Sequence, residues 1–421
     1  MTATASAETV AVPAPGPLPH GLIAGLGVSQ IISWGTLVYS FPLLAEPTMR
    51  EFGLSKTDVY LLASMALVVA ALAAYPVGVL IDRGYGRMVM GVGSALAGLG
   101  FLAWSQVQAV WQLYPVFLLL GLVQAMALYD AAFAVVARLS GADARRAITA
   151  LTLWGGFAST ALVPLAQLLL DAFGWRGTLA ALGLGNLAIA VLVSTILAER
   201  PLDPLMSAVA PATRPPKENP LRRVVGKPTF WLLLVSFTVY TGIFSALTYH
   251  LYPLLTERGF DAAAVVGAIA VIGPAQVAGR IAVSALAGRL PIGRLGSVIV
   301  AGFPLAALVL LLSGSNLLMV YLFAALYGAA NGIMTIVRGM AVPEMLTRES
   351  YGAINGAMGA PATAAKAAAP VLGALLWQAS GSYDALIVCV LAGALVVATC
   401  FWTAALIVRE ASKKHDRIDA A

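Results

Sequence analysis

The chain has 421 residues, of which 60% are hydrophobic and only 10% charged, and its formal net charge is +6. Soluble domains average about 25% charged residues, so this composition excludes a soluble globular protein and indicates a polytopic membrane protein. The sequence contains no motif for a nucleophile, a metal cluster or a phosphate loop, so we expect neither an enzyme nor a cofactor or metal.

Residues 1–19 are rich in Ala and Pro and lack a basic segment followed by an apolar run. We therefore predict a disordered cytoplasmic lead and not a cleaved signal. Beyond it, a membrane-spanning helix needs about 20 largely apolar residues. Twelve segments meet this requirement, at about 21–45, 58–81, 87–106, 111–138, 147–170, 177–198, 228–255, 262–286, 295–313, 317–341, 352–377 and 384–408.

The second half of the chain repeats features of the first. The sequence FPLL at 41–44 recurs as YPLL at 252–255, and Gly121 in the fourth segment matches Gly328 in the tenth. We predict an all-α membrane protein with twelve transmembrane helices in two pseudo-symmetric six-helix bundles. Its parts are a cytoplasmic N-terminus (1–19), a first bundle (20–198), a linker (199–227), a second bundle (228–408) and a tail (409–421).

The positions of lysine and arginine predict the orientation, because positive residues are retained on the cytoplasmic side. With both termini cytoplasmic, only Arg50, Lys56, Arg176 and Arg258 fall in external loops, and Lys366 alone lies deep inside a segment. Topology therefore explains the positive net charge without a nucleic-acid partner. We expect a multi-pass protein of the cytoplasmic (inner) membrane that acts as a monomer.

The loop after the second segment carries a recognisable motif, GVLIDRGYGR at 78–87. It resembles the cytoplasmic signature of the major facilitator superfamily, and the twelve-helix layout extends this resemblance over nearly the whole chain. Gly78 would let helices approach closely, while Asp82, Arg83 and Arg87 would form a charge network that latches the cytoplasmic face. The alternative is that both arginines serve only as topogenic charges.

Asp130 is the only acidic residue in the interior of a predicted segment, since Asp58 and Asp384 stand at the first position of theirs. A pair with Arg338 of the other half would close the cytoplasmic gate, and protonation of Asp130 would break that pair and couple transport to protons. The alternative is a static ion pair with Arg138 or Arg338. Near the outer end of the seventh segment, His250 is a candidate for gating the external mouth, although a histidine beside tyrosines is often a simple interfacial residue.

Lys366 lies near the middle of the eleventh segment, where a charge costs about 2.5 to 3.5 kcal/mol on insertion scales. Arg280 lies in the eighth segment. Two cations facing one cavity form an anion site, in which arginine binds a carboxylate through two hydrogen bonds and lysine supplies a point charge. The alternatives are a structural role for Lys366 and, for Arg280, a position at the helix end from which it snorkels to water.

The pair of Arg280 and Lys366 is similar to the two cationic positions of the oxalate:formate antiporter group, and the arginine also matches the monocarboxylate transporters. The monocarboxylate pattern has an aspartate four residues before its arginine, where this chain has Gln276, and a lysine where this chain has Leu43. The acid and the extra base that this family uses for proton coupling are therefore absent from these two positions.

Amide and aromatic side chains complete the expected substrate site, because they supply hydrogen bonds and stacking surface to an organic ligand. Each of them has packing as its alternative role. The candidates are Gln30, Trp34, Tyr39, Gln124, Tyr129, Gln276, Tyr327 and Asn331.

These features predict a secondary active transporter of a small organic anion, a carboxylate, with proton-coupled uptake by alternating access. The partners expected are the anion, protons and the lipid bilayer. The alternatives are an exporter or anion exchanger of small organic molecules including drugs, and a non-transporting ligand sensor with the same fold. The fourth segment has no basic residue at its centre, whereas drug:proton antiporters of the superfamily typically carry an arginine there.

Overall fold

The computed structural model describes residues 20–140, 144–197, 224–286, 290–347 and 351–419, and all regular elements within these ranges are helical. The first half contains α1 (His20–Trp34), η1 (Gly35–Tyr39), α2 (Phe41–Phe52), α3 (Lys56–Leu80), η2 (Ile81–Tyr85), α4 (Gly86–Ser105), α5 (Val110–Ala127), α6 (Tyr129–Ser140), α7 (Ala144–Gly155) and α8 (Ala158–Ile196). The second half contains α10 (Pro228–Glu257), α11 (Ala262–Leu286), α12 (Ile292–Leu312), α13 (Leu317–Met345), α14 (Tyr351–Ser380) and α15 (Asp384–Asp419).

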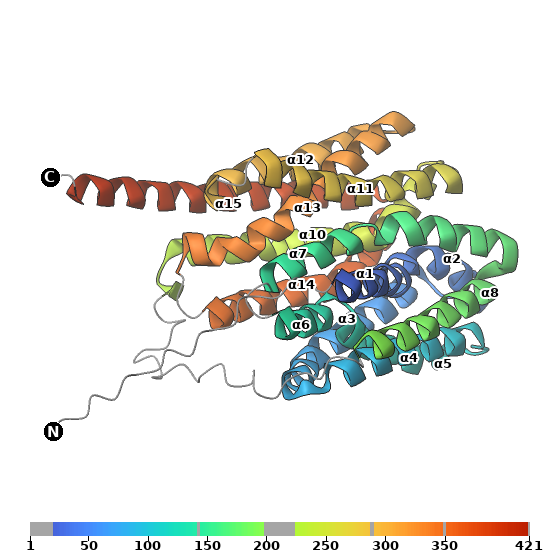
Figure 1. The fold of residues 1–421 in the computed structure, drawn as a ribbon. Helices are drawn as coiled ribbons and strands as arrows, with labels where there is room; N and C mark the ends of the chain where they lie inside the picture. Colours follow the sequence, from blue (N-terminus) through green and yellow to red (C-terminus); the bar gives the residue numbers. More distant parts are fainter. Residues whose placement is uncertain (1–19, 141–143, 198–223, 287–289, 348–350, 420–421) are drawn as a thin grey trace, which may run out of the picture.

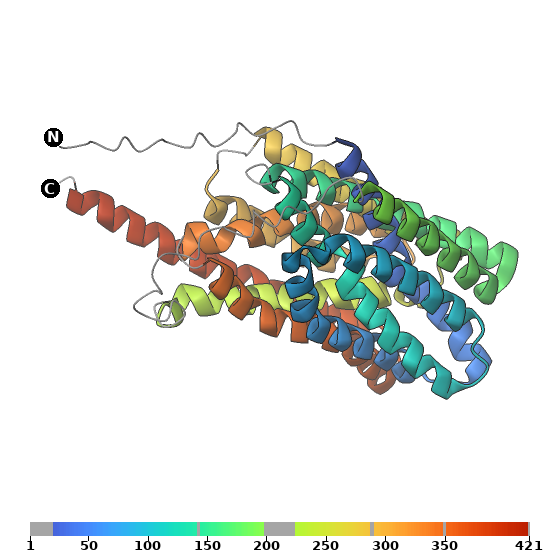
Figure 2. The same ribbon diagram turned by 60° about the horizontal axis from the view of Figure 1, so that its bottom comes forward.

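Ten of the described helical segments are long and apolar enough to cross a membrane. One of these, Ala147–Ile196, is interrupted at Gly174, where φ is 65° and ψ is 178°, so it folds back and makes two crossings. The helix α14 carries Lys366 and occupies the place of the eleventh predicted segment. The helices from blue to green and those from yellow to red form two groups that lie side by side (Figures 1 and 2).

We call the side on which α10 begins and α15 ends the terminal side, which is on the left in Figure 1. The opposite side, which contains the turns between α2 and α3 and between α10 and α11, is the distal side. The last turns of α15 extend beyond the other helices on the terminal side (Figures 1 and 2).

Some membrane-crossing helices bend where the regular α-helical hydrogen-bond pattern is interrupted. In the first crossing, the amide of Ser40 donates to the carbonyl of Gly35 at 2.8 Å, which closes the π-helical turn η1 directly before Pro42. In the fourth crossing, Leu128 is extended between α5 and α6, with ψ of −170°. Such bends change the direction in which side chains point, and both lie next to residues that line the central cavity.

The two repeated glycines make equivalent contacts in the two halves. A Cβ atom on Gly121 of α5 would lie 2.3 Å from the carbonyl oxygen of Ala66 in α3. A Cβ atom on Gly328 of α13 would lie 2.6 Å from the carbonyl oxygen of Ile272 in α11. Each half therefore packs one helix pair backbone against backbone at the position that the sequence repeat indicates.

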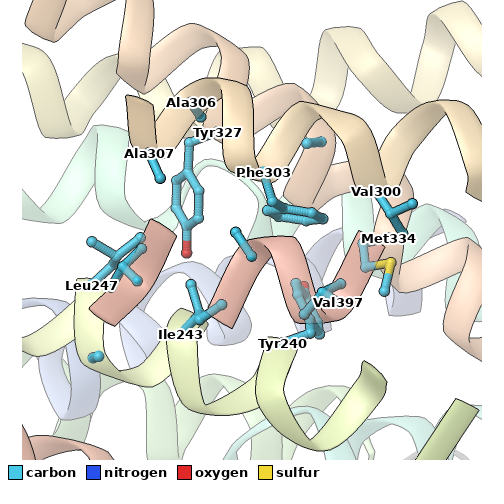
Figure 3. Close-up of a cluster of buried hydrophobic side chains, with 14 of the residues drawn as sticks. Tyr240, Ile243, Leu247, Val300, Phe303, Ala306, Ala307, Tyr327, Met334 and Val397 are labelled. Carbon is cyan, nitrogen blue, oxygen red and sulfur yellow. The ribbon is translucent and has the colours of Figure 1, made fainter. Parts of the chain in front are cut away.

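A large apolar core holds the second half together. In Figure 3, Tyr240, Ile243 and Leu247 of α10 face Phe303 of α12 and Tyr327 of α13. All five side chains are buried. This core packs α10 and α13, which both line the central cavity, against α12 and α15.

The glycine contacts predict that alanine destabilises the protein at the two packed positions and not at an open one. We expect Gly121→Ala and Gly328→Ala each to lower thermal stability in detergent, because overpacking a filled contact typically costs about 1 to 3 kcal/mol. Gly185→Ala is the matched control, since no atom lies within 4 Å of its would-be Cβ. The midpoint of thermal unfolding, followed by size-exclusion chromatography, checks this, and equal midpoints for all three variants would contradict it.

Candidate functional site

A cavity of about 470 Å³ lies between the two halves. It extends from the middle of the bundle toward the terminal side, and helices of both halves line it. The charged residues on its wall are Asp130 from the first half and Arg280, Arg338 and Lys366 from the second. The uncharged polar and aromatic residues on its wall are Trp34, Tyr39, Gln124, Tyr129, Phe133, Tyr240, Thr241, Phe244, Gln276, Asn331, Thr335 and Thr363.

Lys366 is held in the cavity wall by the backbone of α14. Its carbonyl oxygen accepts a hydrogen bond from Ser245 Oγ of α10 at 2.8 Å. Its ammonium nitrogen lies 5.9 Å from the ring centroid of Trp34 in the other half. Among the described residues, no hydrogen bond or ion pair reaches Lys366 Nζ, so this nitrogen faces the cavity without a protein partner from the middle of the membrane span.

Arg280 is buried, with 6% of its surface exposed. Its Nε donates to the carbonyl of Gly332 in α13 at 3.0 Å, and its Nη1 donates to the carbonyl of Thr152 in α7 at 2.6 Å. The alternative expectation, that Arg280 snorkels to water from a helix end, is therefore wrong. The guanidinium instead connects the second half to the first beside the cavity.

Asp130 and Arg338 both line the cavity, from opposite halves. Asp130 is exposed to it and Arg338 is partly buried. No ion pair joins them in the described part of the chain, so neither the predicted gate pair nor a static pair between them is formed in this conformation. The side chain of Arg138 lies outside the described residues.

Aromatic rings form a continuous wall on the first half. The ring centroids of Trp34 and Tyr129 are 5.0 Å apart, and those of Tyr129 and Phe133 are 4.8 Å apart with nearly parallel planes. We call these three residues the aromatic wall. Phe133 was not among the residues predicted from the sequence. Its position four residues after Tyr129 on a helix indicates that the two rings meet.

Two buried polar atoms beside the cavity lack a partner among the described residues. They are the indole nitrogen of Trp34 and the amide oxygen of Gln124. A buried donor or acceptor without a partner costs about 1 to 3 kcal/mol.

Eight of the ten predicted substrate-binding residues line the cavity, and Gln30 and Tyr327 do not. Gln30 is fully buried, and its Nε2 donates to the carbonyl of Ala127 at 2.9 Å, where it bridges α1 to the end of α5. Tyr327 lies in the apolar core of the second half (Figure 3), beside a separate cavity of about 30 Å³. Gln276, one of the predicted substrate-binding residues, is buried and lines both cavities.

His250 lies in the seam between the halves on the distal side. It is fully buried, its ring stacks on Tyr60 of α3 with centroids 4.3 Å apart, and its Nε2 lies 2.8 Å from the carbonyl oxygen of Pro370. Because a carbonyl only accepts, Nε2 carries the proton, and Nδ1 then accepts from the hydroxyl of Tyr383 at 3.3 Å. The alternative expectation of a residue at the lipid interface is therefore wrong.

Lys56 holds the same seam closer to the distal surface. Its Nζ lies 3.5 Å from the ring centroid of Trp377 and 4.0 Å from Glu257 Oε2. Glu257 also accepts from the indole nitrogen of Trp377 and from the backbone amide of Tyr383, at 2.5 and 2.8 Å. The sequence indicated only that Lys56 is an external charge, because charge position alone does not reveal contacts across the halves.

A second cavity of about 520 Å³ lies on the distal side, and Glu46, Arg50, Lys56, Tyr60 and Glu257 contribute to its wall. Tyr60 donates to the carbonyl of Tyr249 at 3.0 Å, and the amide of Val371 donates to Ser64 Oγ at 3.2 Å. These contacts of α3 with α10 and α14 separate the distal cavity from the central one. The central cavity is thus closed toward the distal side.

The motif at 78–87 forms the tight turn η2, in which Gly84 has a φ of 94°. The close helix contact expected at Gly78 is not made in this conformation, because no atom of the described part of the chain lies within 4 Å of its would-be Cβ. Arg83 and Arg87 are exposed. The side chain of Asp82 lies outside the described residues, so the predicted latch remains a prediction.

Two helical halves around a central polar cavity that is closed toward the distal side define a membrane transporter that works by alternating access. The family model of the Major Facilitator Superfamily matches residues 26–312. The chain therefore belongs to this superfamily. It is a secondary transporter and not an enzyme.

Relatives and solved structures agree with this assignment. The chain is 32% identical to human monocarboxylate transporter 11 over 272 residues, which is 61% of this chain and about half (51%) of that protein. It is 28% identical to the mouse protein of the same name over 364 residues, covering 84% of this chain and 69% of the relative.

Among solved structures, a bacterial homolog of the human lysosomal transporter Spinster, in an inward-facing and unoccupied conformation, superposes with a TM-score of 0.68. It is 14% identical, over 94% of this chain and 99% of the other. The nucleoside transporter NupG gives a TM-score of 0.68 at 12% identity, over 92% and 99%. At these identities the likeness shows the fold alone.

The contact between the two halves on the distal side, where α3 packs against α10 and α14, can be tested by crosslinking. Thr57 Oγ1 donates to Gln378 Oε1 at 2.8 Å, so cysteines at these two positions lie within reach of each other in this conformation. In a background carrying Cys389→Ser and Cys400→Ser, we expect a short cleavable thiol reagent to join the Thr57→Cys/Gln378→Cys pair. Transport should then stop until the link is cleaved, because the halves must separate here.

Lys56→Ala added to this pair should lower the crosslinked fraction, since Lys56 holds the same seam. Thr57→Cys alone is the control for modification without a link. Full transport by the crosslinked protein would contradict the assignment of this seam as a moving one.

Proposed function

We propose that the transporter carries a small organic anion, a carboxylate, that binds in the central cavity at Lys366. The observation that carries the proposal is the charge of the cavity wall, on which, among the described residues, three basic side chains face one acidic side chain. Charges in a membrane span are costly and mark substrate or ion pathways. A carboxylate supplies the negative charge that this wall favours.

The surroundings of Lys366 support the same ligand. Its ammonium group has no partner among the described residues and points toward Trp34, whose indole N–H is also without one. A carboxylate at this position can accept a hydrogen bond from Lys366 while it lies beside the ring of Trp34. Charge-assisted hydrogen bonds of this kind are about twice as strong as neutral ones.

The relatives support a carboxylate from an independent direction. Human and mouse proteins named monocarboxylate transporter 11 align with 61% and 84% of this chain. The human protein extends well beyond the aligned half, so its name supports the substrate class and no finer detail.

We further propose that both termini are cytoplasmic and that the anion enters the cell with protons. The distribution of Lys and Arg supports this orientation, and it makes the terminal side cytoplasmic. The central cavity, which extends toward that side, then corresponds to the inward-facing state.

Asp130 is the proposed proton carrier. Its carboxylate is exposed to the same cavity as Arg338, on the opposite half. When the cytoplasmic side closes, the ionised Asp130 pairs with Arg338. When Asp130 binds a proton, it loses its negative charge and the pair with Arg338 no longer forms. The bound anion then supplies the negative charge that faces the basic residues of the cavity.

The substrate site is tested by uptake into proteoliposomes with a panel of carboxylates and neutral solutes. We expect Lys366→Ala to reduce carboxylate uptake by about 10- to 100-fold, which corresponds to the loss of one hydrogen bond to a charged group. Lys227→Ala, which removes a lysine at the start of α10 outside the cavity lining, is the matched control. Equal uptake by wild type and Lys366→Ala, or a preference for neutral solutes, would refute the anion site.

Proton coupling is tested by Asp130→Asn. We expect this variant to lose accumulation driven by an inward pH gradient, because the amide no longer binds and releases a proton. Counterflow exchange of the anion should persist, since it needs no net proton movement. Gradient-driven accumulation equal to wild type would refute Asp130 as the carrier, and absence of counterflow in wild type would instead favour a non-transporting sensor.

A further inference from the structure

The two faces of the central cavity differ in chemistry, and this difference bears on the substrate. The first half presents Trp34, Tyr129 and Phe133, the aromatic wall, whereas the second half presents Arg280, Arg338 and Lys366. The inference drawn from this contrast rests on the proposed function, because it assumes that the cations bind a carboxylate.

The volume of the cavity is large for a small acid. The cavity of about 470 Å³ is more than ten times the volume of about 30 Å³ that one water takes in the liquid, so it is larger than a two- or three-carbon carboxylate requires. Such a ligand at Lys366 would leave the aromatic wall in contact with water. Pockets of about 300 to 1,000 Å³ are typical of sites that enclose an organic ligand larger than such an acid.

The aromatic wall is positioned by the packing of the helices. The hydroxyl of Tyr129 lies against Gly155 of α7, where a Cβ atom would come within 2.0 Å of it. The break of the helix at Leu128 turns Tyr129 and Phe133 toward the cavity. All three rings of the wall are only partly buried, so each keeps surface for a ligand.

The cation and the rings are close enough for one molecule to contact both. Lys366 Nζ is 5.9 Å from the centroid of the Trp34 ring, and that ring is 5.0 Å from Tyr129. A planar ring that carries a carboxylate places its charge at Lys366 while its face stacks on the aromatic wall. Ala70, Ala71 and Ala74 of α3 line the same space without polar groups.

We propose that the transported anion is a planar aromatic or heteroaromatic carboxylate, stacked on Trp34, Tyr129 and Phe133 with its carboxylate at Lys366. The wall then determines specificity, and Lys366 determines that the substrate is an acid. Small aliphatic acids bind the same lysine and gain nothing from the rings.

The test is equilibrium competition against radiolabelled benzoate on the purified full-length protein. Benzoate and cyclohexanecarboxylate are matched in size and charge, and they differ in planarity and aromatic character. We expect benzoate to bind about five- to tenfold more tightly, as one or two ring contacts supply. Lactate should bind more weakly than either.

Substitutions test whether the aromatic wall causes the preference for benzoate over cyclohexanecarboxylate. Tyr129→Leu and Trp34→Leu should reduce the benzoate-to-cyclohexanecarboxylate ratio to about one, whereas Tyr129→Phe, which retains a ring, should keep it above that of Tyr129→Leu. Gly155→Ala should reduce the ratio without changing any residue of the wall, because it displaces the Tyr129 ring. Tyr114→Leu, at an exposed tyrosine of α5 away from the cavity, is the control and should leave the ratio unchanged.

Each failure has a distinct meaning. A wild-type ratio near one, with binding that still depends on Lys366, overturns the aromatic substrate and leaves the carboxylate site standing. A ratio that Tyr129→Leu and Trp34→Leu do not change overturns the role of the wall. Carboxylate binding that is absent, or indifferent to Lys366→Ala, overturns the proposed function together with this inference.

Discussion

Positive charge in the middle of a membrane-spanning bundle is the constraint on which the rest of the structure depends. A lysine at the centre of a span costs about 2.5 to 3.5 kcal/mol on insertion scales, and Lys366 occupies such a place in α14. The cost is reduced where the ammonium faces a polar, hydrated space. The bends at η1 and Leu128 and the polar residues on both halves maintain that space around Lys366.

The same constraint explains why the two sides of the seam differ. On the distal side, α3 packs against α10 and α14 through stacked rings and single hydrogen bonds, among them Tyr60 with His250 and Ser64 with Val371. Such contacts exclude water from the path to Lys366, yet each is weak enough to break when the halves rock. The Lys56 contacts with Glu257 and Trp377 add a charged closure at the rim.

The sequence predicted the elements whose signals are strong and local. Apolar segments, the glycine repeat and an isolated lysine follow directly from the cost of polar groups in lipid, and they identified the superfamily fold and most of the cavity wall. The sequence left open whether Arg280 faces the cavity or snorkels to water, because a residue one turn nearer the helix middle has the same sequence signal as one that snorkels. Whether Gln30 and Tyr327 face the cavity depends on helix rotation, and a helix that is apolar on all sides carries no periodicity to fix it. The contacts of Lys56 join residues 201 and 321 positions away in the chain, so local patterns do not reveal them.

The most direct test of the account is a structure of the protein with 4-iodobenzoate bound. The iodine scatters anomalously and marks the end of the ring opposite the carboxylate, so one data set gives both the site and the orientation of the ligand. The account predicts the carboxylate at Lys366 Nζ, with the ring against Trp34 and Tyr129 in the central cavity. Iodine found only in the distal cavity, or a carboxylate turned away from Lys366, would contradict it.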